Sequence, residues 1–374
     1  MSDNNEKKTT DLRILRAVDR AIADLRRGLP VFVRGPREAS LVLATEMAFQ
    51  PELENLAIRS GSKPVLVLTA HRANVLHIMP TGEEIIRVEI EDWMDAPLMR
   101  ALADATHDLD QPFRGPFSRL IDPAPESFFP AVKLAKLARL LPSVLAAPVA
   151  LDNVAEIAGR EDLSVIDMAD ITAFEETAAM RLRPVAAARV PLQASENTTF
   201  HAFRPEDGGI EHLAIVVGDP SRRDPVLARL HSECFTGDLI GSLKCDCGEQ
   251  LRGALKALQE AGGGVLLYLA QEGRGIGLIN KLRAYDLQGQ GFDTIDANER
   301  LGFDADERIF LPAAEMFKLL GFKRIRLMTN NPEKVAGLER HGIEVTERVA
   351  HKFPSNTHNE LYLATKKKRS GHYL

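Results

Sequence analysis

The sequence predicts an α/β protein built from two domains. Its 374 residues are enough for about two domains with separate cores. Strand and helix patterns alternate through the second half, which is typical of an α/β domain with a mixed or mostly parallel sheet. Pro184 and Pro191 mark the transition between the halves. We therefore expect a disordered tail at 1–11, an α+β domain at 12–182 and an α/β domain at 183–374.

The elements expected in the first half follow from the spacing of apolar residues. These residues recur at helical spacing from Leu12 to Leu25, and Gly28 ends that helix. Short apolar runs at 31–33 and 64–69 predict strands. Two further helical stretches are expected, at 128–147 with an interruption at Pro142, and at 166–183.

The second half has clearer boundaries, because glycines follow several of its helical patterns. Strands are expected at 213–217, 226–230, 265–269 and 325–328. Helices are expected at 248–261, 276–288, 313–320 and 332–340. The basic run Lys366–Arg369 is expected to be a solvated tail.

Composition limits the partners and the compartment. The net charge of −6 gives no general attraction to nucleic acid or to an acidic membrane. No apolar run is long enough to span a membrane, and the first residues lack the apolar stretch of a secretory signal. Three cysteines within fourteen residues, Cys234 to Cys247, argue against a disulfide framework and for the reducing cytoplasm.

These cysteines instead indicate a metal site. Cys234, Cys245 and Cys247 supply three soft thiolates, which favour zinc. If the segment is extended, the last two thiols face the same side. Three interpretations stay open on spacing alone: a structural zinc with His231 as fourth ligand, a catalytic zinc with water in that place, or no metal. The polar residues around the cysteines favour a functional site over a structural one.

A glycine-rich loop at 271–277 follows a predicted strand and opens a helix, where backbone N–H groups can meet an anion. It lacks the third glycine of a dinucleotide-binding fingerprint, because that position is Leu278. The chain also has no phosphate-binding P-loop motif. The loop can still approach a nucleotide, with Glu272 bound to ring N–H groups and Arg274 to phosphate.

Four segments together resemble GTP cyclohydrolase II over roughly half the chain, from about Arg183 onward: HSECFTGDLIGSLKCDCGEQL, QEGRGIGLINKLRAYDLQGQGFDT, DANERLGFDADER and TNNPEKV. The resemblance implies hydrolysis of GTP to 2,5-diamino-6-ribosylamino-4(3H)-pyrimidinone 5′-phosphate, formate and pyrophosphate. This reaction is the first step of riboflavin biosynthesis. It also implies a zinc ion that activates water for attack on C8 of guanine, Mg²⁺ on the triphosphate, and a homodimer.

The resemblance also assigns residues. It makes Cys234, Cys245 and Cys247 the zinc ligands, with water in the fourth place. The residues implied to hold GTP are Arg229, Leu230, His231, Ser232, Glu233, Gln250, Glu272, Gly273, Arg274, Thr294, Thr329 and Lys334. Tyr285, Asp306 and Arg308 match catalytic positions. For Arg308 two roles stay open, a nucleophile at the α-phosphorus with Asp306 as base, or a stabiliser of transition-state charge.

The first half faintly resembles 3,4-dihydroxy-2-butanone 4-phosphate synthase, on the segments AIADLRRGLPVFV and LVLATEMA. In that family an acidic loop between them binds Mg²⁺ and substrate. Here the loop at 34–40 holds one acid, Glu38, and two arginines. Because a divalent ion needs clustered carboxylates, we expect a non-catalytic domain kept for dimerisation or regulation.

The sequence leaves two other functions open. One is a relative that hydrolyses another nucleotide, as in uracil catabolism; the intact Tyr285 and Asp306 argue against it. The other is a nucleotide-binding scaffold with a structural zinc, in which replacement of Cys247 would unfold the domain. The specific motif set favours the cyclohydrolase over both.

Overall fold

The computed structural model describes residues 2–112, 114–206 and 208–351. The predicted tail at Lys366–Arg369 lies outside the described residues. The chain forms two units. Unit 1 holds the chain up to Glu175 together with Ile279–Phe292 and Asp296–Asp306, and unit 2 holds Glu176–Leu278, Asp293–Ile295 and the chain from Glu307 onward. Each sheet belongs to one unit, so the predicted α/β class with two domains is confirmed.

Unit 1 is built on a seven-stranded mixed sheet in the order β5-β4-β3-β6-β2-β1-β7. All its pairings are antiparallel except that of β1 with β7. The strands are β1 (Val31–Arg34), β2 (Ala39–Ala44), β3 (Val65–Thr69), β4 (Ile85–Glu89), β5 (Arg119–Leu120), β6 (Ser143–Val149) and β7 (Val165–Asp167). The interior strand β2 is buried along its whole length, which is why its apolar run does not alternate with polar residues.

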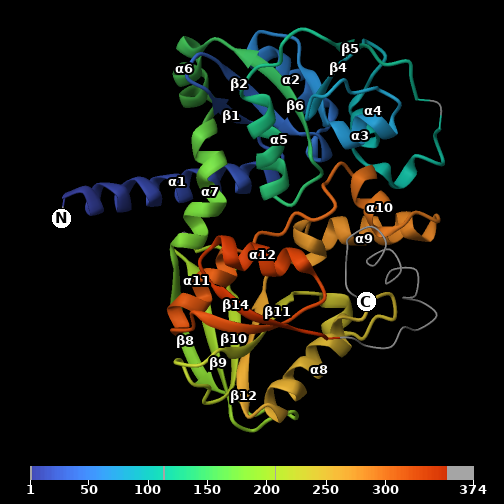
Figure 1. Cartoon of the computed structure of the whole chain (residues 1–374). Helices are drawn as coiled ribbons and strands as arrows, with labels where there is room; N and C mark the ends of the chain where they lie inside the picture. Colours follow the sequence, from blue (N-terminus) through green and yellow to red (C-terminus); the bar gives the residue numbers. More distant parts are fainter. Residues whose placement is uncertain (1, 113, 207, 352–374) are drawn as a thin grey trace. The chain divides into compact units, whose positions relative to one another are not determined.

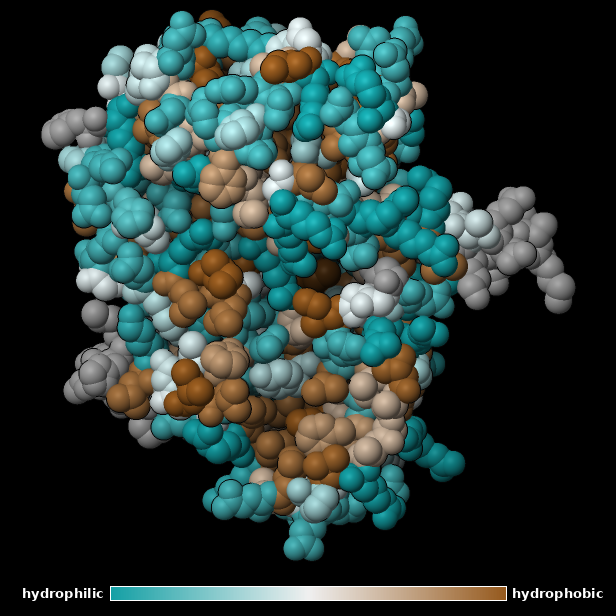
Figure 2. Space-filling model, turned by 180° about the vertical axis from the view of Figure 1, so that it is seen from behind, coloured by the Kyte–Doolittle hydropathy of each residue, from teal (hydrophilic) through white to brown (hydrophobic). Residues whose placement is uncertain are grey.

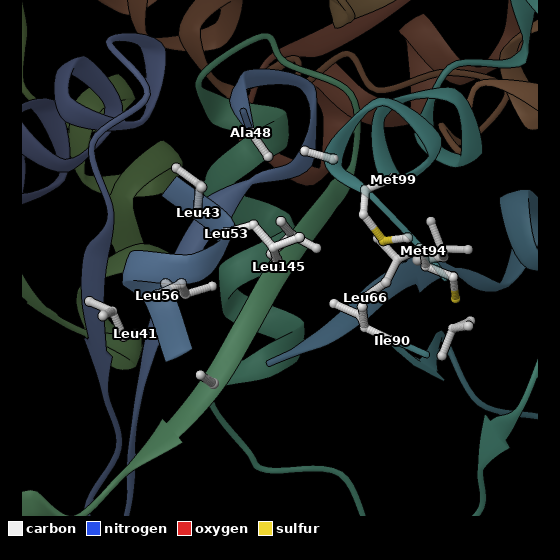
Figure 3. Close-up of a cluster of buried hydrophobic side chains, with 14 of the residues drawn as sticks. Leu41, Leu43, Ala48, Leu53, Leu56, Leu66, Ile90, Met94, Met99 and Leu145 are labelled. Atoms are coloured by element: carbon white, nitrogen blue, oxygen red, sulfur yellow. The ribbon is translucent and has the colours of Figure 1, made fainter. Parts of the chain in front are cut away.

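Helices cover both faces of this sheet (Figure 1). They are α1 (Ser2–Arg26), α2 (Gln50–Ser60), α3 (Ala70–Val75), α4 (Ala96–Ala103), α5 (Phe128–Leu137), α6 (Leu151–Glu161) and α7 (Met168–Met180). One core holds apolar residues of α1, α5 and α7. The other holds those of α2, α3, α4 and α6, and Figure 3 shows part of it, with Leu53 and Leu56 close to Leu145 of β6.

Unit 2 has its own seven-stranded sheet in the order β14-β13-β11-β12-β10-β9-β8. Its strands are β8 (Leu182–Arg189), β9 (Thr198–Pro205), β10 (His212–Gly218), β11 (Val226–Ser232), β12 (Gly263–Leu269), β13 (Arg324–Met328) and β14 (Glu344–Val349). The four strands β14, β13, β11 and β12 are parallel, and β12, β10, β9 and β8 are antiparallel. The sheet is therefore mixed, as expected.

Helices also lie on both faces of the second sheet. Residues of α11 (Leu311–Leu320) and α12 (Pro332–Arg340) pack in one core. Residues of α8 (Cys247–Glu260) pack in the other. The remaining helices α9 (Leu278–Gly289) and α10 (Thr294–Arg300) belong largely to unit 1. Among the described residues, no helix is long and apolar enough to cross a membrane.

Three expectations differ from the structure. Residues 2–11, expected to be disordered, form the start of α1. A helix that the apolar pattern from Leu12 onward has already started extends readily into the residues before it, because adding a residue costs far less than starting a new helix. The expected helix at 128–147 ends at Leu137, and residues 143–149 form β6 between β2 and β3. Burial of that apolar run in the sheet outweighs its helix propensity. The two units divide between Glu175 and Glu176.

Candidate active site

The three cysteines come together at one end of β11. Cys234 lies two residues beyond that strand, Cys245 lies in the following loop, and Cys247 is the first residue of α8. The Sγ atoms of Cys234 and Cys245 are 3.7 Å apart, and the three Sγ atoms lie within 4.8 Å of one another. Tetrahedral ligands with bonds of about 2.3 Å are separated by roughly 3.8 Å. The thiols are therefore spaced for a single zinc ion.

The local backbone differs from the extended segment considered for Cys245 and Cys247. Asp246 has φ −98° and ψ 10°, and the helix begins at the next residue. This places the Cys247 thiol at a helix N-terminus, where the dipole favours a thiolate. Turn and helix geometry thus brings the two thiols together in place of strand alternation.

Gly237 lets the loop pass close to the sulfurs. It lies in the π-helical turn Phe235–Leu239. A Cβ atom at Gly237 would lie 2.7 Å from Cys245 Sγ and 3.1 Å from Cys234 Sγ. Real side chains do not tolerate such distances, so the thiol cluster requires glycine at this position.

Asp238 forms hydrogen bonds with three groups next to the cysteines. Its carboxylate accepts hydrogen bonds from the Cys234 backbone N–H at 3.0 Å and from the Tyr268 hydroxyl at 2.9 Å. His231 Nε2 lies 3.0 Å from each of its oxygens. His231 is thus engaged with Asp238, and the thiol trio forms the metal-ligating group without it. Burial lowers the pKa of His231, which keeps its ring neutral.

The proximity of the three thiols also raises the pKa of Cys247. Hydrogen bonding with Cys234 and Cys245, together with burial, raises the pKa of Cys247 well above its usual value. Three neighbouring thiols cannot all ionise without a compensating cation. A divalent ion reverses this preference, because it deprotonates the thiols that bind it. The chemistry of the donor set therefore fits a metal ion.

The expected nucleotide-binding residues gather at the carboxyl ends of parallel strands. Ser232, the last residue of β11, pairs with Leu269, the last residue of β12. Glu272 and Arg274 follow β12, and Thr329 follows β13. Ligands of open α/β sheets bind beyond this edge. The carboxyl edge therefore joins residues that are about a hundred positions apart in sequence.

A buried chain of polar groups supports this edge. Arg229 donates to the Met328 carbonyl at 2.9 Å and to the side-chain oxygen of Gln250. Gln250 in turn donates to the Asp246 carboxylate, next to Cys247. Burial lowers the pKa of Arg229 to about 10, so its guanidinium stays charged at neutral pH. Hydrogen bonds thus connect two of the expected nucleotide-binding residues, Arg229 and Gln250, to Asp246, the neighbour of Cys247.

Lys334 brings a second buried cation to the same edge. It lies in the first turn of α12, and its Nζ donates to the Leu230 carbonyl at 2.8 Å. Thr329 Oγ1 accepts from the Asn331 backbone N–H at 3.0 Å, which shapes the turn into α12. Arg308 Nη1 lies 3.4 Å from Ser232 Oγ. Lys334 and Arg308 therefore contact β11 near its carboxyl end, and Arg229 of β11 itself adds a third cationic side chain there.

The loop after β12 has unusual backbone geometry. Gly273 and Arg274 have φ of 64° and 61°, in the left-handed region that residues with side chains rarely adopt. Both oxygens of Glu272 accept backbone N–H groups, from Phe235 at 2.6 Å and from Gly273 at 2.9 Å. The structure thus fixes the Glu272 carboxylate against the loop that carries the cysteines.

The three expected catalytic residues do not fall in one unit. Tyr285 lies in α9 and belongs to unit 1, with Lys281 Nζ 5.5 Å from its ring centre. Asp306 is the last residue of the unit 1 segments, and Arg308 belongs to unit 2. Thr294, the first residue of α10, lies in a short stretch of unit 2.

Some residues of the site had no counterpart among the sequence-predicted ones. Tyr268 lies within the continuous apolar run of β12, and His351 follows β14, where it contacts the Gln250 carbonyl at 3.0 Å. No local motif marks either residue. Asp238 is one of the polar residues around the cysteines, but its contact with His231 depends on the turn between them.

In the N-terminal half, the arginines of the loop at 34–40 are paired with acids. Arg34 Nε lies 2.7 Å from Asp167, and Arg37 contacts Glu126. Glu38, the single acid of this loop, accepts from the Ser127 backbone N–H at 2.9 Å. Each of these carboxylates already has a partner within the chain.

The fold and the thiol cluster define an α/β protein with a centre able to hold a metal ion. Residues 183–350 match the sequence model of GTP cyclohydrolase II. A protein of Azospirillum brasilense named GTP cyclohydrolase-2 is 52% identical over 367 residues, which make up 97% of this chain and 95% of that one. The chain therefore belongs to the GTP cyclohydrolase II family, a family of hydrolases, and it is an enzyme. The predicted family and enzyme class are confirmed.

Other relatives match part of the chain. A GTP cyclohydrolase-2 of Haemophilus influenzae is 61% identical over 165 residues, 44% of this chain and 76% of that one. A riboflavin biosynthesis protein of Synechocystis is 45% identical over 254 residues, 65% of this chain and 46% of that one. Among solved structures, a two-domain 3,4-dihydroxy-2-butanone 4-phosphate synthase from A. baumannii covers 89% of this chain and 99% of that one, with 15% identity and a TM-score of 0.35.

Proposed function

We propose that the chain catalyses zinc-dependent hydrolysis of GTP to 2,5-diamino-6-ribosylamino-4(3H)-pyrimidinone 5′-phosphate, formate and pyrophosphate, as the first step of riboflavin biosynthesis. The observation that carries this proposal is the position of the thiol cluster. The cluster lies directly beyond β11, at the edge where the expected GTP residues also gather. Membership in the GTP cyclohydrolase II family supports the choice of substrate.

Cys234, Cys245 and Cys247 would hold the zinc. Three protein ligands leave one tetrahedral position for water, as in catalytic zinc sites. The engagement of His231 with Asp238 supports this choice over a structural site with four protein ligands. When bound, the ion supplies a water molecule whose pKa falls to about 7, which makes hydroxide available at neutral pH.

The remaining roles follow from charge and geometry. Arg229, Arg274 and Lys334 would neutralise phosphate charge together with Mg²⁺ on the triphosphate. Among the described residues, the thiol trio is the only group of three clustered metal-ligating side chains, so we assign Mg²⁺ to the substrate's phosphates. Glu272, oriented by two backbone N–H groups, would accept from the N–H groups of guanine.

Tyr285, Asp306 and Arg308 complete the proposed machinery. Tyr285 would position or donate a proton during ring opening. An arginine side chain is a cation without a free proton acceptor. The contact of Arg308 with Ser232 at the edge where phosphate is expected supports charge stabilisation more directly than nucleophilic attack, because a protonated guanidinium has no free electron pair.

The proposal is tested by incubating zinc-loaded protein with GTP and Mg²⁺ while formate and the diaminopyrimidine product are followed together. Both products should appear, and both should disappear after metal removal and return with zinc. GTP that stays intact with stoichiometric zinc would refute the proposal. Turnover of uridine nucleotides in its place would favour the alternative cyclohydrolase.

We also propose that the N-terminal half carries no synthase activity. The pairing of Asp167, Glu126 and Glu38 within the chain supports this, since a magnesium site needs carboxylates free to bind the ion. Incubation with ribulose 5-phosphate and Mg²⁺ should give no dihydroxybutanone phosphate. Robust, metal-dependent turnover would contradict the proposal.

The expected homodimer is supported by apolar surface on unit 2. Four large apolar side chains near the cysteines are exposed: Phe235, Leu239, Ile240 and Leu243, at 43%, 71%, 65% and 59%. Separately from these four residues, Figure 2 shows hydrophobic side chains toward the lower end of the face it presents. Contiguous apolar surface typically marks a protein interface. Sedimentation should give twice the mass of the chain. The proposed location is the reducing cytoplasm, where free thiols persist.

A further inference from the structure

The chain leaves unit 2 after Leu278 and returns to it at Glu307, apart from Asp293–Ile295. The residues between fold with the N-terminal half. This excursion, residues 279–292 and 296–306, carries Tyr285 and Asp306, two of the three proposed catalytic residues. Figure 1 shows its helices α9 and α10 in orange, and the N-terminal elements in blue and teal. Side chains of the N-terminal half contact this excursion at both of its ends.

Arg283 of α9 forms ion pairs with two carboxylates of the N-terminal half. Its Nη2 lies 2.9 Å from Glu46 Oε1, and its Nε lies 2.9 Å from Asp104 Oδ2. The side chains of all three residues are largely buried, with exposed fractions between 17% and 22%. Partly buried, charge-assisted contacts of this length are among the stronger polar interactions in proteins.

Each member of this cluster is itself fixed. The second oxygen of Glu46 accepts the Leu141 backbone N–H at 2.9 Å. Arg283 Nη1 donates to the Asn280 side-chain oxygen at 2.8 Å, and Asn280 donates to the Arg139 carbonyl at 3.0 Å. A cluster in which every polar group has a partner restricts rotation of α9 about its axis. Tyr285 lies two residues beyond Arg283 on the same helix.

The end of the excursion is held in the same way. Thr69 Oγ1 donates to the Gly302 carbonyl at 2.9 Å. Asp304 lies 3.2 Å from His71 Nε2 and 3.1 Å from Lys136 Nζ. Asp306 lies two residues further on. Contacts from the N-terminal half therefore come close in sequence to both catalytic residues of the excursion.

We propose that the N-terminal half positions the catalytic segment of the cyclohydrolase, with Glu46 and Asp104 as positioning residues that act through Arg283. This inference rests on the function proposed above. It gives a non-catalytic domain a part in the chemistry of the other half. Rate depends steeply on such placement, because a shift of about 1 Å in a catalytic group can cost up to roughly a hundredfold.

The shorter relatives limit this role to chains such as this one. The matched region covers 76% of the Haemophilus protein and 92% of a GTP cyclohydrolase-2 of Pseudomonas paraeruginosa. Little of either chain is left for a unit of this size. Support by an N-terminal half is therefore a property of this chain and is not required by the family.

The test compares kcat and KM for GTP in the full-length, zinc-loaded protein. Glu46→Gln and Asp104→Asn each keep the shape of the side chain and remove its charge. Each should lower kcat roughly tenfold or more while KM stays within about twofold. Glu161→Gln is the matched control, because Glu161 pairs with Arg59 in the same unit at similar burial. The control should leave both constants unchanged.

A second measurement separates positioning from loss of folding. Zinc content and the cooperative thermal transition are recorded for each variant, and Glu46→Asp, which keeps the charge, should restore part of the lost kcat. In the double variant Glu46→Gln with Arg283→Gln, the loss should be smaller than the product of the single losses, because both changes remove one contact.

The outcomes distinguish this inference from the proposed function. Wild-type protein that releases no formate from GTP refutes the proposed function, and the inference falls with it. Active wild type with unchanged kcat in both carboxylate variants refutes the inference alone. Equal losses in the Glu161→Gln control would also overturn it, since any weakened ion pair of the unit would then have the same effect.

Discussion

His231 Nε2 lies 3.0 Å from each carboxylate oxygen of Asp238, although His231 is only three residues before the zinc-ligand candidate Cys234. The same carboxylate accepts the Cys234 backbone N–H. Asp238 therefore couples the orientation of the histidine to the position of a thiol. The contact with Asp238 therefore favours a supporting role for His231 over a role as zinc ligand.

The first prediction concerns metal content. Cys247→Ser should lower bound zinc from about one per chain to a small fraction, because a hydroxyl is a much poorer zinc ligand than a thiolate. His231→Gln should keep about one zinc per chain, since the imidazole is engaged with Asp238. Metal content is measured on purified protein by atomic spectrometry. Zinc loss in the histidine variant equal to that in the cysteine variant would show that His231 is a ligand.

The second prediction concerns the glycine beneath the sulfurs. Gly237→Ala places a Cβ atom 2.7 Å from Cys245 Sγ and 3.0 Å from Cys247 Cβ, so the thiols must move apart. Loss of ligand geometry should weaken zinc affinity by about tenfold or more. Competition with a chromogenic chelator measures the affinity. Gly159→Ala, in α6 where a Cβ meets nothing within 4 Å, is the control and should bind zinc as wild type does.

The thiol cluster shows what sequence alone can predict. Three cysteines within fourteen residues already favour a metal site, because they are close along the chain in any fold. The element pattern of unit 2 was also accessible, since its amphipathic helices and short apolar strands have different periods. The mixed sheet follows from the same alternation.

Contacts between distant segments were not accessible in this way. Arg283 meets Glu46 across more than two hundred residues, and no local pattern records such a pairing. For the same reason the sequence placed the whole region from 183 onward in one domain. The strand β6 was interpreted as part of a helix because the stretch 128–147 is rich in alanine and leucine, which favour a helix, and its place between β2 and β3 is decided by burial.

The third prediction is a pH dependence of stability. Burial lowers the pKa of His351 from about 6.5 to about 4. Above pH 6.5 the imidazole is neutral in the folded and the unfolded chain and contributes no difference. As the pH falls from 6.5 toward 4, the unfolded chain binds a proton that the folded chain does not, so the free energy of unfolding decreases.

His351→Gln provides the comparison for this effect. It removes the titrating group, so the decline in the free energy of unfolding between pH 6.5 and 4 should be shallower than in wild type. Urea unfolding of the zinc-loaded proteins at several pH values gives both curves, and taking their difference cancels the titration of the thiols. Parallel curves would show that His351 does not titrate differently in the two states.

The last prediction concerns a close approach within unit 1. Gly302 has φ +88°, and its carbonyl accepts the Thr69 hydroxyl. A Cβ at this position would lie 2.8 Å from Thr69 Oγ1 and 3.0 Å from Pro142 Cγ. Gly302→Ala therefore combines a strained backbone with overpacking and should lower the free energy of unfolding by about 2–4 kcal/mol.

Gly289→Ala is the matched control for this substitution, because a Cβ at the end of α9 meets nothing within 4 Å. It should be neutral or should stabilise by up to roughly 1 kcal/mol, since alanine restricts the unfolded chain. Chemical denaturation followed by circular dichroism measures both variants. Gly302→Ala as stable as wild type would mean that the end of the excursion is free to move away from Thr69, and the N-terminal half would then hold the excursion through the contacts of α9, among them those of Arg283 and Asn280.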